Sequence, residues 1–277
     1  MNRRNNSVIV LAIFFVCATT GLAQGSTMVD NFDYGSTTDT PISTGAAGDG
    51  WAGGWTGSNP RSGSYLPGGQ LEYAGTGYNN ALNPATTGGV GGLASNDANA
   101  SAISDRAFTA NQTGVVWISA LAKFDAGTPD GETLIWLRSS ASTATFISLR
   151  GGQAKLRYAG ADSASTETFS TGVVHLMLAK LQINPSGNDT IEFWVDPDLS
   201  GGEAGLPTPL LSGNSTDALG AGLSGVGISF YIGGYIDAIR VSNDADGFQQ
   251  VTGIPEPGSL SLLSIGGLAW ILKRRKA

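Results

Sequence analysis

The chain has 277 residues, of which 41 are glycine and 13% are charged, and its formal net charge is −7. Without the six basic residues near the two ends and without Glu256, the body keeps nine basic and 21 acidic residues, a net charge of −12. An acidic surface repels nucleic acid and anionic lipid, which argues against both as partners of the body and leaves divalent cations and neutral sugars open.

Residues 1–23 have the three-part layout of a secretory signal peptide. Two arginines precede an uncharged stretch over 8–18, and the small residues Gly21 and Ala23 stand where signal peptidase recognises its substrate. The apolar stretch is too short to span a bilayer by itself. We therefore expect cleavage after Ala23 and export of the rest of the chain.

Cys17 is the single cysteine and lies inside this apolar stretch. Attachment of a lipid would require a small residue before it, whereas Val16 stands there. The mature chain would then contain no cysteine, which excludes disulfides, thiolate catalysis and cysteine-ligated metal.

The body, residues 24–253, is rich in β-strand patterns bounded by Gly, Pro, Asn and Asp. Strands are predicted over residues 70–73, 115–124, 133–138, 144–150, 153–158, 173–183, 190–196, 226–232 and 235–241. Signals for amphipathic helices are nearly absent, and the Gly-rich stretches 35–69 and 75–99 are expected to be loops with short strands at most. These patterns predict a single all-β domain, a two-sheet antiparallel β-sandwich of the jelly-roll kind.

Four stretches of the body occur in a characteristic order. They are the opening Asp-Asn-Phe-Asp-Tyr at 30–34, the tryptophan-containing loop 50–57, the strand pair 173–183 and 189–196, and the closing strand 235–241. Together they resemble the concanavalin A-like, LamG-related domain. This resemblance implies a jelly roll whose first and last strands lie side by side, and sugar or calcium binding at the loops of one rim. It does not imply an enzymatic activity.

The last residues, 254–277, form a tail of three parts. The triplet Pro255, Glu256 and Pro257 precedes an uncharged stretch over 259–272, and a basic cluster follows, consisting of Lys273, Arg274, Arg275 and Lys276. The tail resembles the PEP-CTERM sorting signal. The resemblance implies a short transmembrane helix held by the basic cluster, and cleavage at the triplet by an exosortase-type protease in bacteria that make extracellular polysaccharide. The alternative is a plain C-terminal membrane anchor that stays in place.

Acidic side chains near the first and last strands are candidates for a metal site. If those strands are neighbours, Asp237 lies near Asp30 and Asp33, and the three carboxylates could hold a structural calcium ion. The favoured interpretation is that Asp237 accepts backbone hydrogen bonds at a strand edge. A turn without metal is likewise favoured for Asp196 to Gly201, because the closing Glu of a calcium loop is missing.

Aromatic residues in the Gly-rich N-terminal part are candidates for a sugar site. Trp51 and Trp55 could stack on sugar rings, although packing in the mouth of the sandwich is the favoured use for them and for Tyr65 and Tyr78.

Catalytic residues are not expected. A retaining glycosidase needs two carboxylates at close spacing, and the nearest pattern, Glu192 with Asp196 and Asp198, is interrupted by Pro197. His175 is the only histidine, and a packed strand histidine is favoured over a Ser-His-Asp triad.

The sequence therefore predicts a non-enzymatic protein of the cell surface or extracellular matrix, structural or carbohydrate-binding, with extracellular polysaccharide as its expected partner. The alternatives are a glycan-processing enzyme on the same fold and an adhesin in which the body is a spacer.

Overall fold

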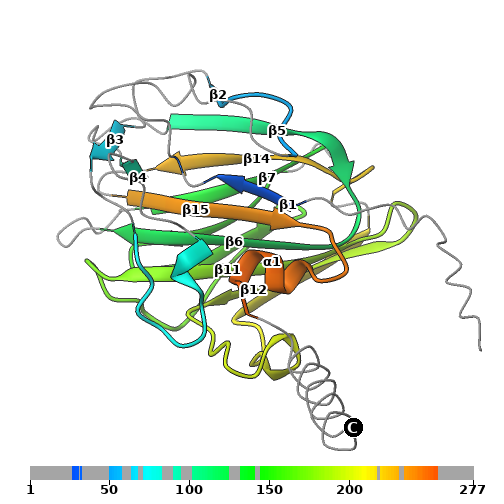
Figure 1. The fold of residues 1–277 in the computed structure, drawn as a ribbon. Coiled ribbons are helices and arrows are strands. Elements are labelled where there is room, and N and C mark those ends of the chain that lie inside the picture. Colours follow the sequence, from blue (N-terminus) through cyan, green and yellow to red (C-terminus); the bar gives the residue numbers. More distant parts are fainter. Residues whose placement is uncertain are drawn as a thin grey trace, which may run out of the picture.

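The structure is a computed structural model, and it describes residues 27–30, 32, 50–57, 64–67, 71–82, 90–94, 102–124, 132–140, 144–216, 219–230 and 234–254. These residues form two antiparallel sheets that pack face to face (Figure 1). The signal peptide, Asp33 and the tail from Pro255 onward lie outside the described residues.

The first sheet has eight strands. Its order is β13 (Leu211–Thr216), β12 (Asn188–Val195), β11 (Val174–Ile183), β6 (Gly114–Phe124), β15 (Gly234–Ser242), β4 (Val90–Ala94) and β3 (Ser64–Pro67), and β1 (Thr27–Asp30) also pairs with β15. Thr27 is in register with Ser242, and Asp30 with Ile239. The first and last strands therefore lie side by side, as the resemblance implied (Figure 1).

The second sheet has seven strands. Its order is β10 (Ala161–Ala164), β9 (Gln153–Tyr158), β8 (Thr145–Arg150), β7 (Glu132–Ser139), β14 (Leu223–Phe230), β5 (Ala102–Gln112) and β2 (Thr56–Gly57). The glycines at 151 and 152 both have positive φ, which permits the tight turn between β8 and β9.

The main hydrophobic core lies between the two sheets. Alternate side chains of each strand enter it, because successive residues of a strand point to opposite faces. Ile135 and Leu137 of β7 contribute from one sheet, and Val116 and Ile118 of β6 from the other. The prediction of a two-sheet antiparallel sandwich is confirmed.

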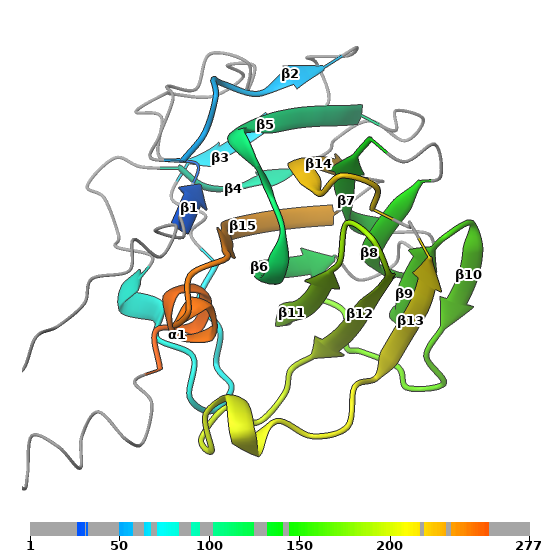
Figure 2. The ribbon, with the colours of Figure 1, turned by 90° about the vertical axis from the view of Figure 1, so that its right-hand side faces the viewer.

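A second hydrophobic cluster covers the outer face of the eight-stranded sheet. Trp117 and Trp194 stack there at 6.1 Å between ring centroids. The helix α1 (Gly247–Thr252) lies against β6 and β15, on the side away from β7 to β10 (Figure 2). Phe248 of α1 contacts Trp117 edge-on at 5.1 Å, and Gly253 in the left-handed conformation ends the helix. Because α1 and this second hydrophobic cluster cover the outer face of the eight-stranded sheet, the two outer faces of the sandwich differ.

Most strand predictions are confirmed to within a few residues. The prediction over 70–73 is wrong, because the described residues 71–74 have no strand structure. Strands β5, β10 and β13 were not predicted, nor was the six-residue helix α1. Among the described residues, no helix has both the length and the apolar composition needed to cross a membrane.

Candidate functional site

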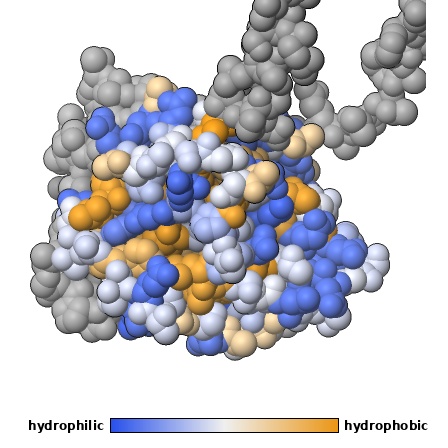
Figure 3. All heavy atoms as spheres, turned by 90° about the horizontal axis from the view of Figure 1, so that it is seen from below, coloured by the Kyte–Doolittle hydropathy of each residue, from blue (hydrophilic) through white to orange (hydrophobic). Residues whose placement is uncertain are grey.

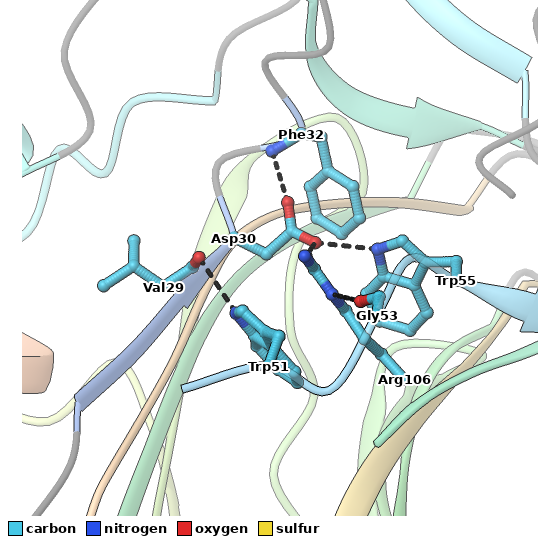
Figure 4. A network of polar contacts seen from close by, with 7 residues as sticks. All are labelled: Val29, Asp30, Phe32, Trp51, Gly53, Trp55 and Arg106. Atoms are coloured by element: carbon cyan, nitrogen blue, oxygen red, sulfur yellow. Dashed lines mark hydrogen bonds and ion pairs between the residues drawn. The ribbon is translucent and has the colours of Figure 1, made fainter. Parts of the chain in front are cut away.

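A buried ion pair organises the N-terminal aromatic residues (Figure 4). Asp30 Oδ2 accepts hydrogen bonds from Arg106 and, at 2.7 Å, from Trp55 Nε1. Asp30 Oδ1 accepts the Phe32 N–H at 2.8 Å, and both charged side chains are 2% exposed. Arg106 also donates to the Gly53 carbonyl at 3.0 Å. The Asp30 carboxylate is thus neutralised by a cation of the protein itself.

Trp51 and Trp55 belong to this buried cluster. They are 3% and 1% exposed, and the Arg106 guanidinium lies 4.5 Å from the Trp51 ring centroid. Trp51 Nε1 donates to the Val29 carbonyl at 3.1 Å (Figure 4). The stacking role predicted for both residues is wrong in this structure, because neither ring face is open to a sugar, and the favoured packing role is confirmed.

Asp237 lies on β15, at the point where the strand that pairs with β15 changes from β4 to β1. Its Oδ2 accepts the Leu71 N–H at 3.0 Å, and its Oδ1 accepts the Ala238 N–H at 2.7 Å. The favoured interpretation, a carboxylate that accepts backbone hydrogen bonds, is confirmed. Among the described residues, no three His, Cys, Asp or Glu side chains are grouped to hold a metal ion. Asp33 is not described, and calcium stays a prediction of the sequence.

The carboxylates near the end of β12 have separate partners in the structure. Asp196 accepts the Leu176 N–H at 2.8 Å and contacts His175, while Asp198 accepts the Ser200 N–H at 2.9 Å in a turn. Glu192 lies opposite Lys180 on β11. These contacts assign the carboxylates of Asp196 and Asp198 to holding backbone in place.

His175 is a packed strand histidine, as favoured from the sequence. Its ring stacks on Phe124 and is 4% exposed. Nδ1 lies 2.6 Å from Asp196 Oδ2, and Nε2 lies 2.8 Å from the Ser170 carbonyl oxygen. Both partners are acceptors, so the protonated imidazole, in which both ring nitrogens donate, satisfies both contacts. Burial lowers the pKa of His175, but the hydrogen bonds to Asp196 and Ser170 outweigh burial and raise that pKa above its usual value.

The outer face of the seven-stranded sheet differs from that of its partner, because polar and aromatic side chains remain partly exposed on it. We call the charged and aromatic side chains on the outward side of β7 to β10 the basic face; they are Glu132, Trp136, Arg138, Phe146, Arg150, Lys155, Arg157 and Asp162. They point outward because the alternate residues of the same strands enter the core.

Strand register aligns these side chains in rows across the sheet. One row runs Asp162, Arg157, Phe146 and Trp136 through four adjacent strands. Trp136 and Phe146 meet edge-on at 5.0 Å, and the Arg157 guanidinium lies 5.3 Å from the Phe146 ring centroid. One guanidinium and two aromatic rings therefore lie next to one another along a line perpendicular to the strands.

A hollow of about 240 Å³ opens on the basic face. Its lining includes Glu132, Phe146, Arg150, Lys155 and Arg157. Burial raises the pKa of the Glu132 carboxyl, against the opposing effects of Arg150, Ser148 and Lys155. The hollow is smaller than the pockets of about 300 to 1,000 Å³ that enclose drug-sized ligands. Its size suits part of a chain molecule that continues beyond it.

A second hollow of about 440 Å³ lies on the eight-stranded sheet, beneath the segment that follows β12. Its aromatic residues, Trp117 and Trp194, are 2% and 4% exposed and support the second hydrophobic cluster. Lys180 in its wall pairs with Glu203 at 2.7 Å. Polar and apolar residues are interspersed over the underside of the molecule, where this segment runs (Figure 3). Lys180, Glu203 and Trp194 of this hollow are thus already bonded within the protein, since Trp194 Nε1 donates to the Pro207 carbonyl at 2.8 Å.

No protein-family model and no curated protein sequence matches the chain. Solved structures similar to it include lectin II from Ulex europaeus, with a TM-score of 0.41 and 10% identity over 78% of this chain and 98% of the lectin. An endo-β-1,4-glucuronan lyase from Trichoderma reesei has a TM-score of 0.37 and 11% identity over 77% of this chain and 94% of the lyase. A carbohydrate-binding module from Bacillus subtilis has a TM-score of 0.29 and 14% identity over 63% and 96%. Structural similarity as low as this does not assign a role to any residue of the chain.

The basic face was not among the candidates from the sequence. Its residues are spread over four strands and form no local motif; only their cross-strand register brings them together. The predicted processing residues Pro255, Glu256 and Pro257, and the basic cluster Lys273 to Lys276, lie outside the described residues.

Proposed function

We propose that the chain is an exported, non-enzymatic carbohydrate-binding protein of the cell surface or extracellular matrix, and that it binds glycan on the basic face. The observation that carries this proposal is the row of Arg157, Phe146 and Trp136 beside the hollow. Sugar rings offer C–H faces that pack on aromatic surface and hydroxyls that accept hydrogen bonds from guanidinium groups.

Export and surface placement are proposed from the two ends of the chain. The layout of residues 1–23 supports removal by signal peptidase, and the tail 254–277 supports sorting by an exosortase-type protease through a membrane-anchored stage. Both kinds of processing would deliver the acidic body to a place where polysaccharide is the abundant polymer.

The test is affinity electrophoresis of the full chain through gels that contain a panel of bacterial and plant polysaccharides. We expect retardation by at least one polymer, and we expect Phe146→Leu to weaken it about fivefold, which corresponds to about 1 kcal/mol for an aromatic contact. Tyr235→Leu is a matched control, because Tyr235 lies beneath Lys123 at 5.0 Å on the other sheet. An unretarded wild-type chain would contradict the proposal and favour the adhesin-spacer alternative.

A glycan-processing enzyme is the second candidate, and Glu132 is the observation in its favour. A carboxyl with a raised pKa beside a hollow is a typical general acid. This candidate predicts release of reducing ends, or of unsaturated products, from a polymer that the chain binds, with loss of activity in Glu132→Gln. Binding without product after prolonged incubation would rule it out.

A further inference from the structure

We propose that the glycan bound on the basic face is an acidic one, a polymer carrying carboxylates such as those of uronic acids. This inference rests on the proposed function and narrows its ligand class. Its basis is a local reversal of charge, together with one lysine whose ammonium group makes no hydrogen bond or close ion pair with any described residue.

The basic face is cationic within an acidic body. Four of the nine basic residues of the body lie on it, namely Arg138, Arg150, Lys155 and Arg157. The hollow itself is lined by three cations and two carboxylates, Glu132 and Asp162. Because the body as a whole carries −12, an anionic polymer meets less repulsion on this surface than the net charge of the body would impose.

Three of the four cations are paired. Arg157 makes a bidentate contact with Asp162, with Nε to Oδ1 and Nη2 to Oδ2 both at 2.5 Å. Arg138 contacts Asp105 at 2.5 Å, and Arg150 lies 3.9 Å from Glu132. The Arg157 pair is exposed, 38% and 60% for the two side chains, so water screens it and a competing carboxylate could replace Asp162 at small cost.

Lys155 is the exception. No hydrogen bond or ion pair joins its ammonium to any residue that the structure describes, although the side chain is only partly exposed and lines the hollow. Its neighbours in register are small, Ser148 on β8 and Ala164 on β10, so neither supplies an anion. The carboxylates of Glu132 and Asp162 line the same hollow and interact with the Lys155 charge, but neither forms a close ion pair with it. A carboxylate of a ligand in the hollow would pair with the Lys155 ammonium. Arg157, the next residue of β9 on the same face, lies beside it.

A neutral sugar leaves this arrangement unused. Aromatic surface and hydroxyl acceptors would suffice for it, and the Lys155 ammonium would gain no anion from it. An acidic glycan uses both features, because its rings can lie along the row at Phe146 while its carboxylates meet Lys155 and Arg150.

The experiment compares each acidic polymer with its own neutral form. The full chain is run in gels containing polygalacturonate, alginate or hyaluronan, and in parallel gels containing the methyl ester of the same polymer. We expect at least one acidic polymer to retard the chain, its ester to bind at least about tenfold more weakly, and added NaCl to reduce the retardation.

Variants locate the interaction. Lys155→Gln should weaken binding of the acidic polymer about tenfold, and Lys155→Arg should restore most of it. Lys180→Gln is the matched control, because it removes the same charge from the opposite sheet and should change binding less than twofold. An unchanged melting temperature for each variant confirms that the fold is retained.

The outcomes separate the inference from the proposed function. Equal binding of a polymer and its ester, or binding only to neutral polysaccharides, would overturn the acidic ligand and leave carbohydrate binding standing. Equal retardation by single-stranded DNA would show a general polyanion site and also overturn the inference. Binding to none of the polymers, acidic or neutral, would overturn both.

Discussion

The ion pair between Asp30 and Arg106 allows the sharpest test of how this fold is held together. Replacing Asp30 by Asn keeps the shape of the side chain but removes its charge, which leaves the buried Arg106 guanidinium without its anion. Breaking a buried pair by removing one partner costs about 3 to 5 kcal/mol. The value should be near the upper end, because Trp55 and Phe32 also donate to the same carboxylate.

Urea denaturation followed by tryptophan fluorescence measures this cost, and Trp51 and Trp55 report on the cluster itself. With a denaturant dependence of about 3 kcal/mol/M for a domain of this size, a cost of about 4 to 5 kcal/mol should lower the midpoint by about 1.3 to 1.7 M. Arg106→Met should cost a similar amount. The double variant should cost about 2 to 3 kcal/mol less than the sum of the two, because it removes both charges.

Two results would refute this account of the cluster. A cost below about 1 kcal/mol for Asp30→Asn would mean that the pair is not buried as described. Additive costs within about 0.5 kcal/mol would mean that the two side chains do not interact.

Three further predictions concern other parts of the fold. Folding raises the pKa of His175 above 6.5, the ordinary pKa of a histidine. The pair of His175 with Asp196 therefore stabilises the protein fully below pH 6.5, and this stabilisation is lost as the pH rises through the pKa of the folded state. The melting temperature of wild type should therefore fall relative to that of His175→Gln between pH 6 and 9, and parallel curves would contradict a protonated imidazole. Gly227→Val should cost about 1 to 3 kcal/mol in urea denaturation, because a Cβ there would lie 3.1 Å from Arg138 Nε and would also crowd Asp105; a neutral effect would contradict this packing. A chelator should change the melting temperature by less than about 1 °C, because the Asp30 carboxylate is already neutralised by Arg106. A larger drop that Asp237→Asn reproduces would contradict this expectation and support a calcium site.

Sequence patterns predicted the long strands that are rich in apolar residues. In β6 and β11 nearly every side chain is buried, in the main core on one face and in the second hydrophobic cluster on the other, so each strand stands out as an apolar run without any partner. The resemblance to the concanavalin A-like domain implied that the first and last strands would be neighbours, and β1 does pair with β15.

The missed strands lack this pattern for identifiable reasons. In β5 the core-facing position 106 is an arginine, so a charged residue stands where the alternation requires an apolar one. Its burial is possible only because Asp30 reaches it from a distant part of the chain. The strands β10 and β13 are at sheet edges and carry mostly polar or small residues, so they bury little and leave no apolar period.

The sequence and the tertiary structure each determined different features of this protein. Local alternation and turn residues were enough to establish an all-β chain, because the side-chain direction along a strand depends only on the strand itself. The burial of Trp51 and Trp55, the neutralisation of Asp30, and the row from Arg157 to Trp136 were decided by the tertiary structure alone. Each depends on the register between strands that are distant in sequence, and that register is set by the packing of two complete sheets.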